Sequence, residues 1–473
     1  MPTRLEVLER DTPAQVHTRS LDLLCKVGVR VETARGREIL RAAGAQVDEN
    51  SHIVKFPPNL VEEALRLAPK QFRLGSRRGD PGFQVNAGMC ALMSDGGALF
   101  VFDAEKDERR PATYEDFLYS TRLVEALDEI EMFWWMARPA LDMSHAPTFV
   151  RFWRDVFANT SKHVQDSTET PEQARWLLEM LQIIHGGRAQ VRKLHPFSWL
   201  VCPLSPLTIE GGFIDAYLET VGWDMPLAAM PMPLMGMTAP GRLAATLLQG
   251  NTEVLAVLCL QQAACPGAPF IYAPALSAAE PHSARFSGGA VEHALLGAAV
   301  SEMGRFYGLP VQASTGGSDN PAPGVQCTYE RALNWALPGL SWPDILVGPG
   351  LLDGATTLSI EQLVLDLEVY TRVKRLRYGI DCSESRWLEE VIEKVGPQGS
   401  YLAQRSTSQA LRSGEWQLPS IGFHDTYAAW EQSPPDILSE ARQKAQEALL
   451  KHQPLPLEEG VVRELEELER KLI

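Results

Sequence analysis

The central part of the chain alternates between short apolar runs and longer amphipathic stretches, with Pro or Gly at many of the corners between them. The apolar runs between residues 129 and 380 are IEMFWWMA, KHVQDS, FSWLVCPLSPL, PLAAMPMPL, FIYAPALS, VQASTGG and ILVGPG. Helical periodicity follows several of these runs, and the clearest helical stretches end at a Gly. Such strand–helix units in series predict an α/β fold with a parallel (β/α)8 TIM barrel as its core. No eighth strand stands out, so a doubly wound sheet is the alternative fold.

The first 128 residues carry a different pattern, which predicts an N-terminal α+β extension. Two amphipathic stretches, AQVHTRSLDLLCKVGVRV and ETARGREILRAAGAQV, predict helices. Further along, two apolar runs flank Gly96-Gly97 in ALMSDGGALFVFD. A Gly-Gly pair between apolar runs is typical of a hairpin turn, so this segment predicts a β-hairpin.

The last part of the chain, residues 381–473, is predicted to be a C-terminal helical region. Its end, EARQKAQEALLKHQPLPLEEGVVRELEELERKLI, joins two amphipathic helices through a linker that contains proline. Charges of opposite sign at i,i+4 spacing explain its composition as an exposed helical surface. We therefore expect it to pack on the barrel or to form a contact between copies in a homo-oligomer.

Composition excludes several classes of protein. The net charge of -16 over 473 residues opposes binding to nucleic acid, because a polyphosphate backbone repels an acidic surface. No run approaches the roughly 18 apolar residues of a membrane span, and the polar opening MPTRLEVLERDTPAQ lacks the apolar core of a signal peptide. We expect a cytoplasmic protein with neither nucleic acid nor membrane as a partner.

The seven cysteines form no C-x-x-C pair, so they are interpreted as small buried side chains in a reducing compartment. A zinc site would require Cys202, Cys327 and distant histidines to converge from separate strand ends. Local ligand spacing is absent, and we therefore predict no metal site.

Several segments, taken in order, resemble the trimethylamine methyltransferase superfamily, a family related to methanogenesis. They are DERRPATYEDF at 107–117, CPLSPLT at 202–208, PMPLMGMTAPGRLAATLLQGNTEVLA at 231–256, VQASTGGSDNPAPGVQCTYE at 311–330, LLDGATTLSIEQLVLDLE at 351–368 and KHQPLPL at 451–457. In the trimethylamine-specific members, the polar loop of the fourth segment carries pyrrolysine. This chain has only ordinary residues there. The resemblance therefore implies the branch without pyrrolysine, whose characterised members demethylate quaternary amines such as glycine betaine.

The resemblance also implies the reaction and its partner. A methyl group would move from a betaine-like quaternary amine to cob(I)alamin, the corrinoid cofactor. The chain has no Asp-x-His-x-x-Gly pattern of a corrinoid-binding domain, so we expect a separate corrinoid protein to carry the cobalamin. Many relatives have a lysine and an aspartate in the loop where this chain has Pro321 and Gly324, which removes two charges near the expected reaction centre.

A quaternary ammonium has no N–H to donate, so its recognition should rely on aromatic faces, with a carboxylate nearby. The strand runs supply five aromatic candidates for substrate binding, namely Phe133, Trp134, Trp135, Trp199 and Tyr272. Alternatively, such residues simply pack inside the barrel or under its helices. Because consecutive strand residues point to opposite faces, at most one of Trp134 and Trp135 is expected to face a pocket.

Polar candidates follow the sixth run. Gln312, Ser318 and Asp319 are the catalytic candidates, whereas Thr315, Gly316 and Gly317 are expected to contact the substrate or the corrin. Alternatively, Ser318 and Asp319 cap the next helix through its backbone N–H groups.

Three more residues are candidates for substrate binding. Glu361 is either a pocket residue or a first-turn acid of a helix capped by Ser359. Arg138 and His163 could bind the carboxylate of a betaine, although a lone histidine is more often structural.

Two other functions stay open from the sequence. One is a different barrel methyltransferase, which uses a metal to act on thiols or methoxy groups. The other is a non-catalytic protein that binds quaternary amines, which would keep the aromatic pocket and lose the corrinoid-docking mouth.

Overall fold

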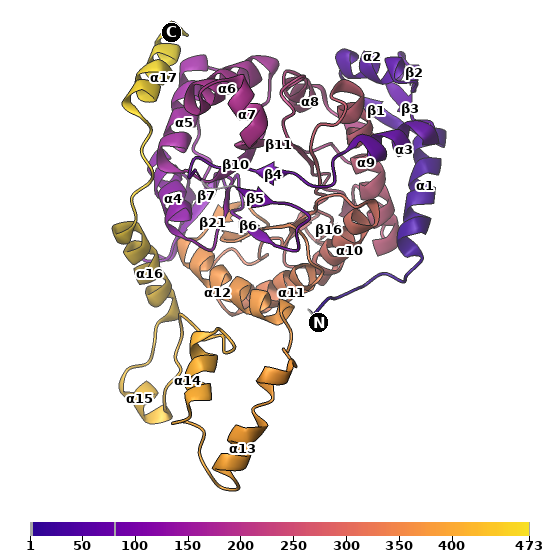
Figure 1. Cartoon of the computed structure of the whole chain (residues 1–473). Helices are drawn as coiled ribbons and strands as arrows, with labels where there is room; N and C mark the ends of the chain where they lie inside the picture. The colour runs from indigo at the N-terminus through magenta and orange to yellow at the C-terminus, as the bar shows by residue number, and fades with distance from the viewer. Residues whose placement is uncertain (1–2, 80–81, 473) are drawn as a thin grey trace.

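The computed structural model describes residues 3–79 and 82–472 and is built around one eight-stranded parallel sheet (Figure 1). In spatial order the strands are β15, β13, β11, β10, β9, β6, β19 and β18. A parallel bridge between Tyr272 and Val311 joins the two edges, so the sheet closes into a barrel and confirms the predicted fold. The strands are β6 (Ala91–Met93), β9 (Met132–Phe133), β10 (His163–Asp166), β11 (Phe197–Val201), β13 (Leu227–Ala229), β15 (Phe270–Tyr272), β18 (Gln312–Ser314) and β19 (Ile345–Val347).

A helix follows each barrel strand, and local sequence signals set several of the helix ends. Thr113, Thr170 and Ser359 each accept a backbone N–H from the first turn of the helix that follows. Gly186 and Gly308 end two helices in the left-handed conformation that glycine adopts without strain. The helices are α4 (Tyr114–Ala126), α5 (Ala146–Asn159), α6 (Pro171–His185) with α7 (Arg188–Leu194), α8 (Gly211–Leu218), α9 (Leu243–Ala264), α10 (Val291–Tyr307), α11 (Val325–Leu340) and α12 (Ile360–Arg377).

The eighth strand is β6, and the predicted hairpin around Gly96-Gly97 is wrong. After β6 the chain continues beside the loop that follows β9, because Gly97 and Ala98 donate their N–H groups to the carbonyls of Trp135 and Met136. The second apolar run forms β7 (Phe100–Asp103) in another sheet. In that sheet β7 lies between β8 (Glu108–Pro111) and β21 (Thr357–Leu358), and β20 (Leu351–Leu352) pairs with β21 at the edge. The barrel therefore takes its first strand from the segment interpreted as the N-terminal extension. Three residues are too few for their pattern to separate a barrel strand from a hairpin arm.

The N-terminal segment covers one side of the barrel. Helices α1 (Thr12–Lys26), α2 (Ala34–Ala42) and α3 (Pro58–Leu67) all pack on α9. Strands β1 (Val29–Val31), β2 (Gln46–Asp48) and β3 (Ile53–Lys55) form a small sheet, which β12 (Thr208–Ile209) from a barrel loop completes. The extension is therefore attached to the barrel by both helix packing and strand pairing.

A hairpin of β4 (Arg73–Leu74) and β5 (Phe83–Gln84) closes the amino end of the barrel. Leu74, Phe83 and Val85 belong to the same apolar cluster as the interior residues Ile271 and Ile345. The barrel interior is thus sealed from below, and only its carboxyl end can form an open mouth.

Helix α9 lies in the core. It is the one helix of the described ranges that is long and apolar enough to cross a bilayer, yet 78% of its most apolar stretch is buried inside the protein. The N-terminal helices and β13 supply much of that cover.

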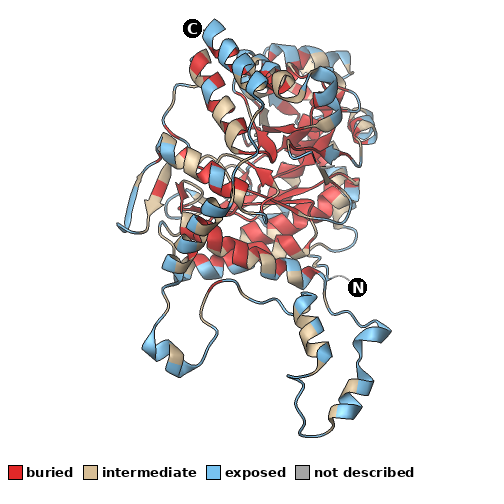
Figure 2. Cartoon of the chain, turned by 60° about the vertical axis from the view of Figure 1, so that its left-hand side comes forward, coloured by how far each residue is buried: buried red, intermediate tan, exposed pale blue. Residues whose placement is uncertain are grey.

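The C-terminal segment packs on the barrel chiefly through its last two helices. Helix α16 (Ile437–Lys451) packs on α12 and α4, and α17 (Glu459–Lys471) packs on α5 and α6. Between α12 and α16 an arm, residues 381–436, carries the short helices α13 (Glu389–Val395), α14 (Arg405–Arg412) and α15 (Tyr427–Gln432), none of which contains a buried residue. The arm projects away from the barrel as a largely exposed extension (Figure 2).

Candidate functional site

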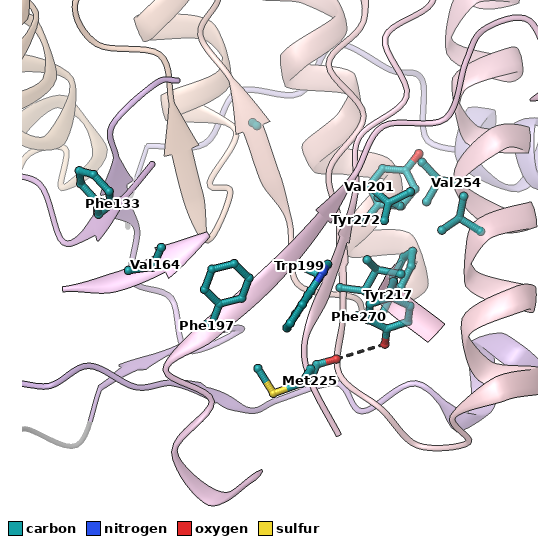
Figure 3. Close-up of a cluster of buried hydrophobic side chains, with 14 of the residues drawn as sticks. Phe133, Val164, Phe197, Trp199, Val201, Tyr217, Met225, Val254, Phe270 and Tyr272 are labelled. Atoms are coloured by element: carbon teal, nitrogen blue, oxygen red, sulfur yellow. Dashed lines mark hydrogen bonds between the residues drawn. The ribbon is translucent and has the colours of Figure 1, made fainter. Parts of the chain in front are cut away.

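The strand aromatics separate into two layers. Phe133, Trp199 and Tyr272 are fully buried in the layer between the strands and the surrounding helices (Figure 3). Tyr272 donates its hydroxyl to Asn251 of α9 at 2.9 Å, and the Trp199 indole donates to Thr168 at 3.3 Å. These three predicted substrate contacts point away from the barrel interior, and their role is packing.

Two glutamines face each other across the interior. In a barrel of this kind, alternate strands supply the side chains of one layer. The pairing register puts Met93, Gln165, Ala228 and Gln312 in the same layer, and β10 and β18 lie on opposite sides of the closed sheet. Both amide atoms of Gln312 and Oε1 of Gln165 are buried and bond to no described residue. Since an unsatisfied buried polar group costs about 1–3 kcal/mol, these atoms are suited to bind a water or a ligand.

Both tryptophans that follow β9 bind one carboxylate. The Trp134 indole N–H donates to Oδ1 of Asp166 at 3.2 Å, and the Trp135 indole N–H donates to Oδ2. Trp134 packs against the interior cluster and Trp135 against the outer cluster, as strand alternation predicts. Their N–H ends nevertheless converge on Asp166, the last residue of β10, because the strand ends at Phe133 and the backbone turns beyond it.

A second carboxyl group belongs to Asp95, and the charged groups that act on it are Arg331 and Asp366. Asp95 follows β6, and its neighbour Gly96 lies so close to the Trp134 ring that an added Cβ would be 2.5 Å from it. Burial raises the pKa of Asp95 to about 6 and that of Asp166 to about 7. The mouth therefore combines an indole with two carboxyls whose ionised forms a bound cation would stabilise.

Ser318 and Asp319 tie loops together and do not cap α11, which begins after Gly324. The Ser318 hydroxyl donates to Glu330 at 2.6 Å. Asp319 accepts the Gly289 backbone N–H at 3.2 Å and the hydroxyl of Ser287. Both side chains thus hold the loop after β18 against neighbouring elements.

Thr315, Gly316 and Gly317 of the same polar loop also contact neighbouring loops. The Thr315 hydroxyl donates to the Val347 carbonyl at 2.9 Å. A Cβ at Gly316, where φ is +63°, would lie 2.4 Å from the Gly288 carbonyl, and one at Gly317 would lie 3.2 Å from the Leu351 carbonyl. The glycines therefore allow loops to approach one another.

Arg331 and Asp366 form a buried ion pair that the sequence interpretation missed. Their side chains are fully buried and 3.4 Å apart. Arg331 donates to the carbonyls of Gly316 and Gly348 at 2.8 and 2.6 Å, while Asp366 accepts the N–H of Gly350 at 2.7 Å. The pair supports the loops after β18 and β19 from behind. The sequence did contain one indication of this pair. Arg331 lies on the apolar face of α11, where a charged side chain needs a buried partner.

The remaining candidates lie apart from one another. His163 sits near the amino end of the barrel, within hydrogen-bonding distance of the Gly75 carbonyl and the Ser198 hydroxyl, and burial lowers its pKa to about 4. Glu361 pairs with Arg442 of α16 at 2.9 Å. Arg138 lies at the surface of the β9 loop, 3.4 Å from Glu169 and with its guanidinium 5.7 Å from the Trp135 ring centre. Of these, only Arg138 lies near the mouth.

Thiol chemistry at the mouth is disfavoured. Burial raises the pKa of Cys202, which follows β11, to about 12, so its thiol stays protonated at neutral pH. Within residues 3–79 and 82–472, no three His, Cys, Asp or Glu side chains are grouped as a metal site.

Comparison with known proteins identifies the family. Residues 2–472 match the family described as trimethylamine methyltransferase (MTTB). Trimethylamine methyltransferase MttB of Methanosarcina barkeri is 28% identical over 98% of this chain and 94% of the relative. Glycine betaine methyltransferase of Desulfitobacterium hafniense is 24% identical over 96% and 94%. The crystal structure of M. barkeri monomethylamine methyltransferase (MtmB) shares the fold, with a TM-score of 0.51 at 12% identity over 93% of this chain and 92% of that one.

Proposed function

Because this chain belongs to the trimethylamine methyltransferase family and is a methyltransferase, we propose that it transfers a methyl group from a quaternary amine to cob(I)alamin on a separate corrinoid protein. The relatives include enzymes named for trimethylamine and for glycine betaine. A quaternary donor is favoured because the loop at 315–324 contains no pyrrolysine. A cytoplasmic location is part of the proposal.

The observation that carries the proposed donor is the hydrogen bond that holds Trp134 to Asp166 at the mouth. It fixes the Trp134 indole beside the Asp166 carboxyl group, and the Trp134 ring also lies against Gly96, the residue after Asp95. A quaternary ammonium binds an indole face through cation–π attraction, which is worth about 0.5–1 kcal/mol in water and about 2 when desolvated. It also favours ionised carboxyls, whose charge is costly in this buried place without a cation.

The proposed reaction depends more on orienting the donor than on general acid–base catalysis. A docked cob(I)alamin would supply the nucleophile, and the C–N bond of the donor would break as its methyl group is transferred. The nitrogen would leave as a neutral tertiary amine that keeps the electron pair of the broken bond, so no proton would be needed in that step. Trp134, Asp95 and Asp166 would hold the ammonium group, and Gln165 and Gln312 would offer polar atoms below it. Their contribution is to position the donor and exclude water.

The rim of the mouth is compatible with a docked corrinoid protein. The loops after β11 and β13 expose the apolar side chains of Leu204, Met232 and Met237. Exposed apolar side chains gathered beside a concave site are typical of a surface that another molecule covers. A broad planar acceptor would reach the donor only from this end, because the β4–β5 hairpin closes the other.

Self-association is also proposed. The arm at 381–436 exposes the large apolar side chains of Trp387, Leu402, Trp416 and Tyr427. So many exposed apolar side chains on an arm whose helices contain no buried residue favour cover by a second copy.

The proposed function is tested by following cob(I)alamin methylation by ultraviolet–visible spectroscopy with glycine betaine, carnitine, choline and trimethylamine as donors. We expect turnover with at least one quaternary amine and much slower turnover with trimethylamine. Rapid turnover of trimethylamine without activity on any quaternary compound would overturn the proposal.

A further inference from the structure

Helix α11 presents an uncharged face to solvent. Within the described residues 325–340 its exposed side chains carry no charge, and they belong to Val325, Thr328, Tyr329, Ala332 and Leu333. The two charged side chains of this helix, those of Glu330 and Arg331, are buried. A helix that borders water normally carries charged side chains on its outer face. The outer face of α11 is therefore suited to contact with protein.

An apolar groove runs along this face. It has a volume of about 820 Å³ and lies between α11, α12 and the start of α16. Its apolar walls include Val325, Ala332, Ala336, Leu365, Val369 and Leu376. Val325 and Leu376 are 86% and 53% exposed. Among the helices that the structure describes, α10 and α12 pack extensively on α11, whereas α16 covers part of α12 and α17 covers part of α5. The groove is thus an exposed apolar surface of the kind that another molecule covers.

The arm at 381–436 carries an apolar stripe that is also exposed. Leu388, Val391, Ile392 and Val395 recur at helical spacing in and just before α13. The side chain of Ile392 is 54% exposed, and α13 contains no buried residue. A hollow of about 580 Å³ separates the segment 380–388 from α14 and its end, so the arm leaves this stripe open on its own.

The charges favour contact between the stripe and the groove. Helix α13 is acidic, because its sequence EEVIEKV carries three glutamates and one lysine. The groove wall is balanced, with Arg331 and Arg372 against Glu368 and Asp436. The neighbouring last turn of α12, by contrast, is basic. In a chain with a net charge of -16, this basic helix end is a place where an acidic helix of another molecule is attracted.

We propose that the arm of a second copy fills the groove, with the stripe of α13 against α11 and α12. The arm begins directly after α12, one wall of the groove, so the two surfaces are neighbours in every copy (Figure 1). Each arm projects away from its own groove (Figure 2). A two-fold axis near the end of α12 gives each arm the groove of its partner, which is the closed arrangement most frequent in homo-oligomers. The inference rests on the self-association proposed above and names the surface that receives the arm.

The test is sedimentation velocity of the full chain and its variants. Leu376→Glu puts an acid in the groove wall opposite the acidic α13, and it should convert the dimer to a monomer. Val325→Glu does so at the other end of the groove, which guards against a local defect in α12. Leu450→Glu is the matched control, an exposed leucine in the last turn of α16, and should leave the dimer unchanged. Thermal melting of each variant identifies a folding defect.

Mixing two monomeric variants identifies the contact. The arm variant, Leu388→Ser with Ile392→Ser, should be monomeric but keeps an intact groove. Leu376→Glu keeps an intact arm, so a mixed pair retains one of the two arm–groove contacts. We expect the mixture to form dimers about tenfold more tightly than either variant alone, since one of the two apolar contacts is restored. If arms instead contacted arms, Leu376→Glu would remain a dimer.

Dimers recovered in the mixture support the proposal, whether or not methyl transfer is found with any amine. A monomeric parent chain overturns it together with the proposed self-association, because the arm is then free or closed on its own groove. The proposal is also overturned if both groove variants keep the mass of the parent, or if the mixture stays monomeric. A parent dimer that only the arm variant dissociates would leave the proposed self-association intact and the groove open to another partner, such as the corrinoid protein. The two failures are therefore distinguishable.

Discussion

Trp134 donates its indole N–H to Asp166 across 3.2 Å, although the two residues are 32 positions apart in the chain. They come from the ends of neighbouring strands, β9 and β10. Trp135 donates to the other oxygen of the same carboxylate. One acid therefore binds two consecutive indoles, that of Trp134 against the interior cluster and that of Trp135 against the outer cluster.

Asp166 should make stability depend on pH. Burial raises its pKa to about 7, so at intermediate pH the folded state holds a proton that the unfolded state, with the ordinary value of 3.8, has lost. Unfolding free energy should therefore fall as pH rises from about 4 to about 7, by a few kcal/mol at most. Urea unfolding at pH 4.5, 6 and 7.5 measures this, and Asp166→Asn should remove that component. An exposed control, Asp22→Asn, should retain it, and an identical profile for Asp166→Asn would contradict the assignment.

Trp134 should be more important to the donor than Trp135. Trp134→Leu removes the aromatic face at the mouth, so we expect a loss of about 1–2 kcal/mol, or about 5- to 30-fold in kcat/KM for the quaternary amine. Trp134→Phe keeps a face but loses the bond to Asp166, and should fall in between. Single-turnover methylation over a range of donor concentrations gives both parameters. Equal effects of Trp134→Leu and Trp135→Leu would argue against recognition at the mouth.

Ser318 should stabilise the loop without supporting the start of α11. Ser318→Ala removes a buried donor to the Glu330 carboxylate, so unfolding free energy should fall by about 1.5–3 kcal/mol. Hydrogen exchange at the first turn of α11 should stay unchanged relative to the rest of the helix, because that helix begins after Gly324. Selective fraying of this turn would instead indicate a cap.

Arg331 and Asp366 should behave as one unit. Arg331→Met leaves Asp366 as an uncompensated buried charge and should cost about 3–5 kcal/mol. The double variant with Asp366→Leu should recover part of that loss. Denaturant unfolding of both singles and the double gives the coupling energy, and strictly additive effects would show that the two side chains act independently.

The arm should control self-association. Replacing Trp387, Leu402 and Trp416 with serine removes exposed apolar surface and should shift the protein from an oligomer to a monomer. Light scattering after gel filtration measures the mass, and thermal melting of the barrel should change little because these residues are outside its core. A monomeric parent protein would refute the proposed association.

Much of the barrel follows from the sequence alone. Seven of its strands coincide with apolar runs, because a buried parallel strand needs a continuous apolar segment and the following helix needs a 3.6-residue period. The helix start at Ser359 was also predicted from the sequence, since a cap is a contact within four residues. The order of short segments such as CPLSPLT identified the family, which the comparisons confirmed.

Only the tertiary structure determined which residues from distant segments contact one another. β6 is a barrel strand because β9 and β19 pair with it. A run of three residues is too short to predict that pairing from the sequence. Phe133, Trp199 and Tyr272 face the helices because the closed register assigns each strand position to a side. Asp166 binds both tryptophans, and Arg331 finds Asp366, only after the barrel brings separate strands and helices together. Local periodicity determines elements, whereas a site depends on contacts between residues far apart in the chain, which form only when the sheet closes.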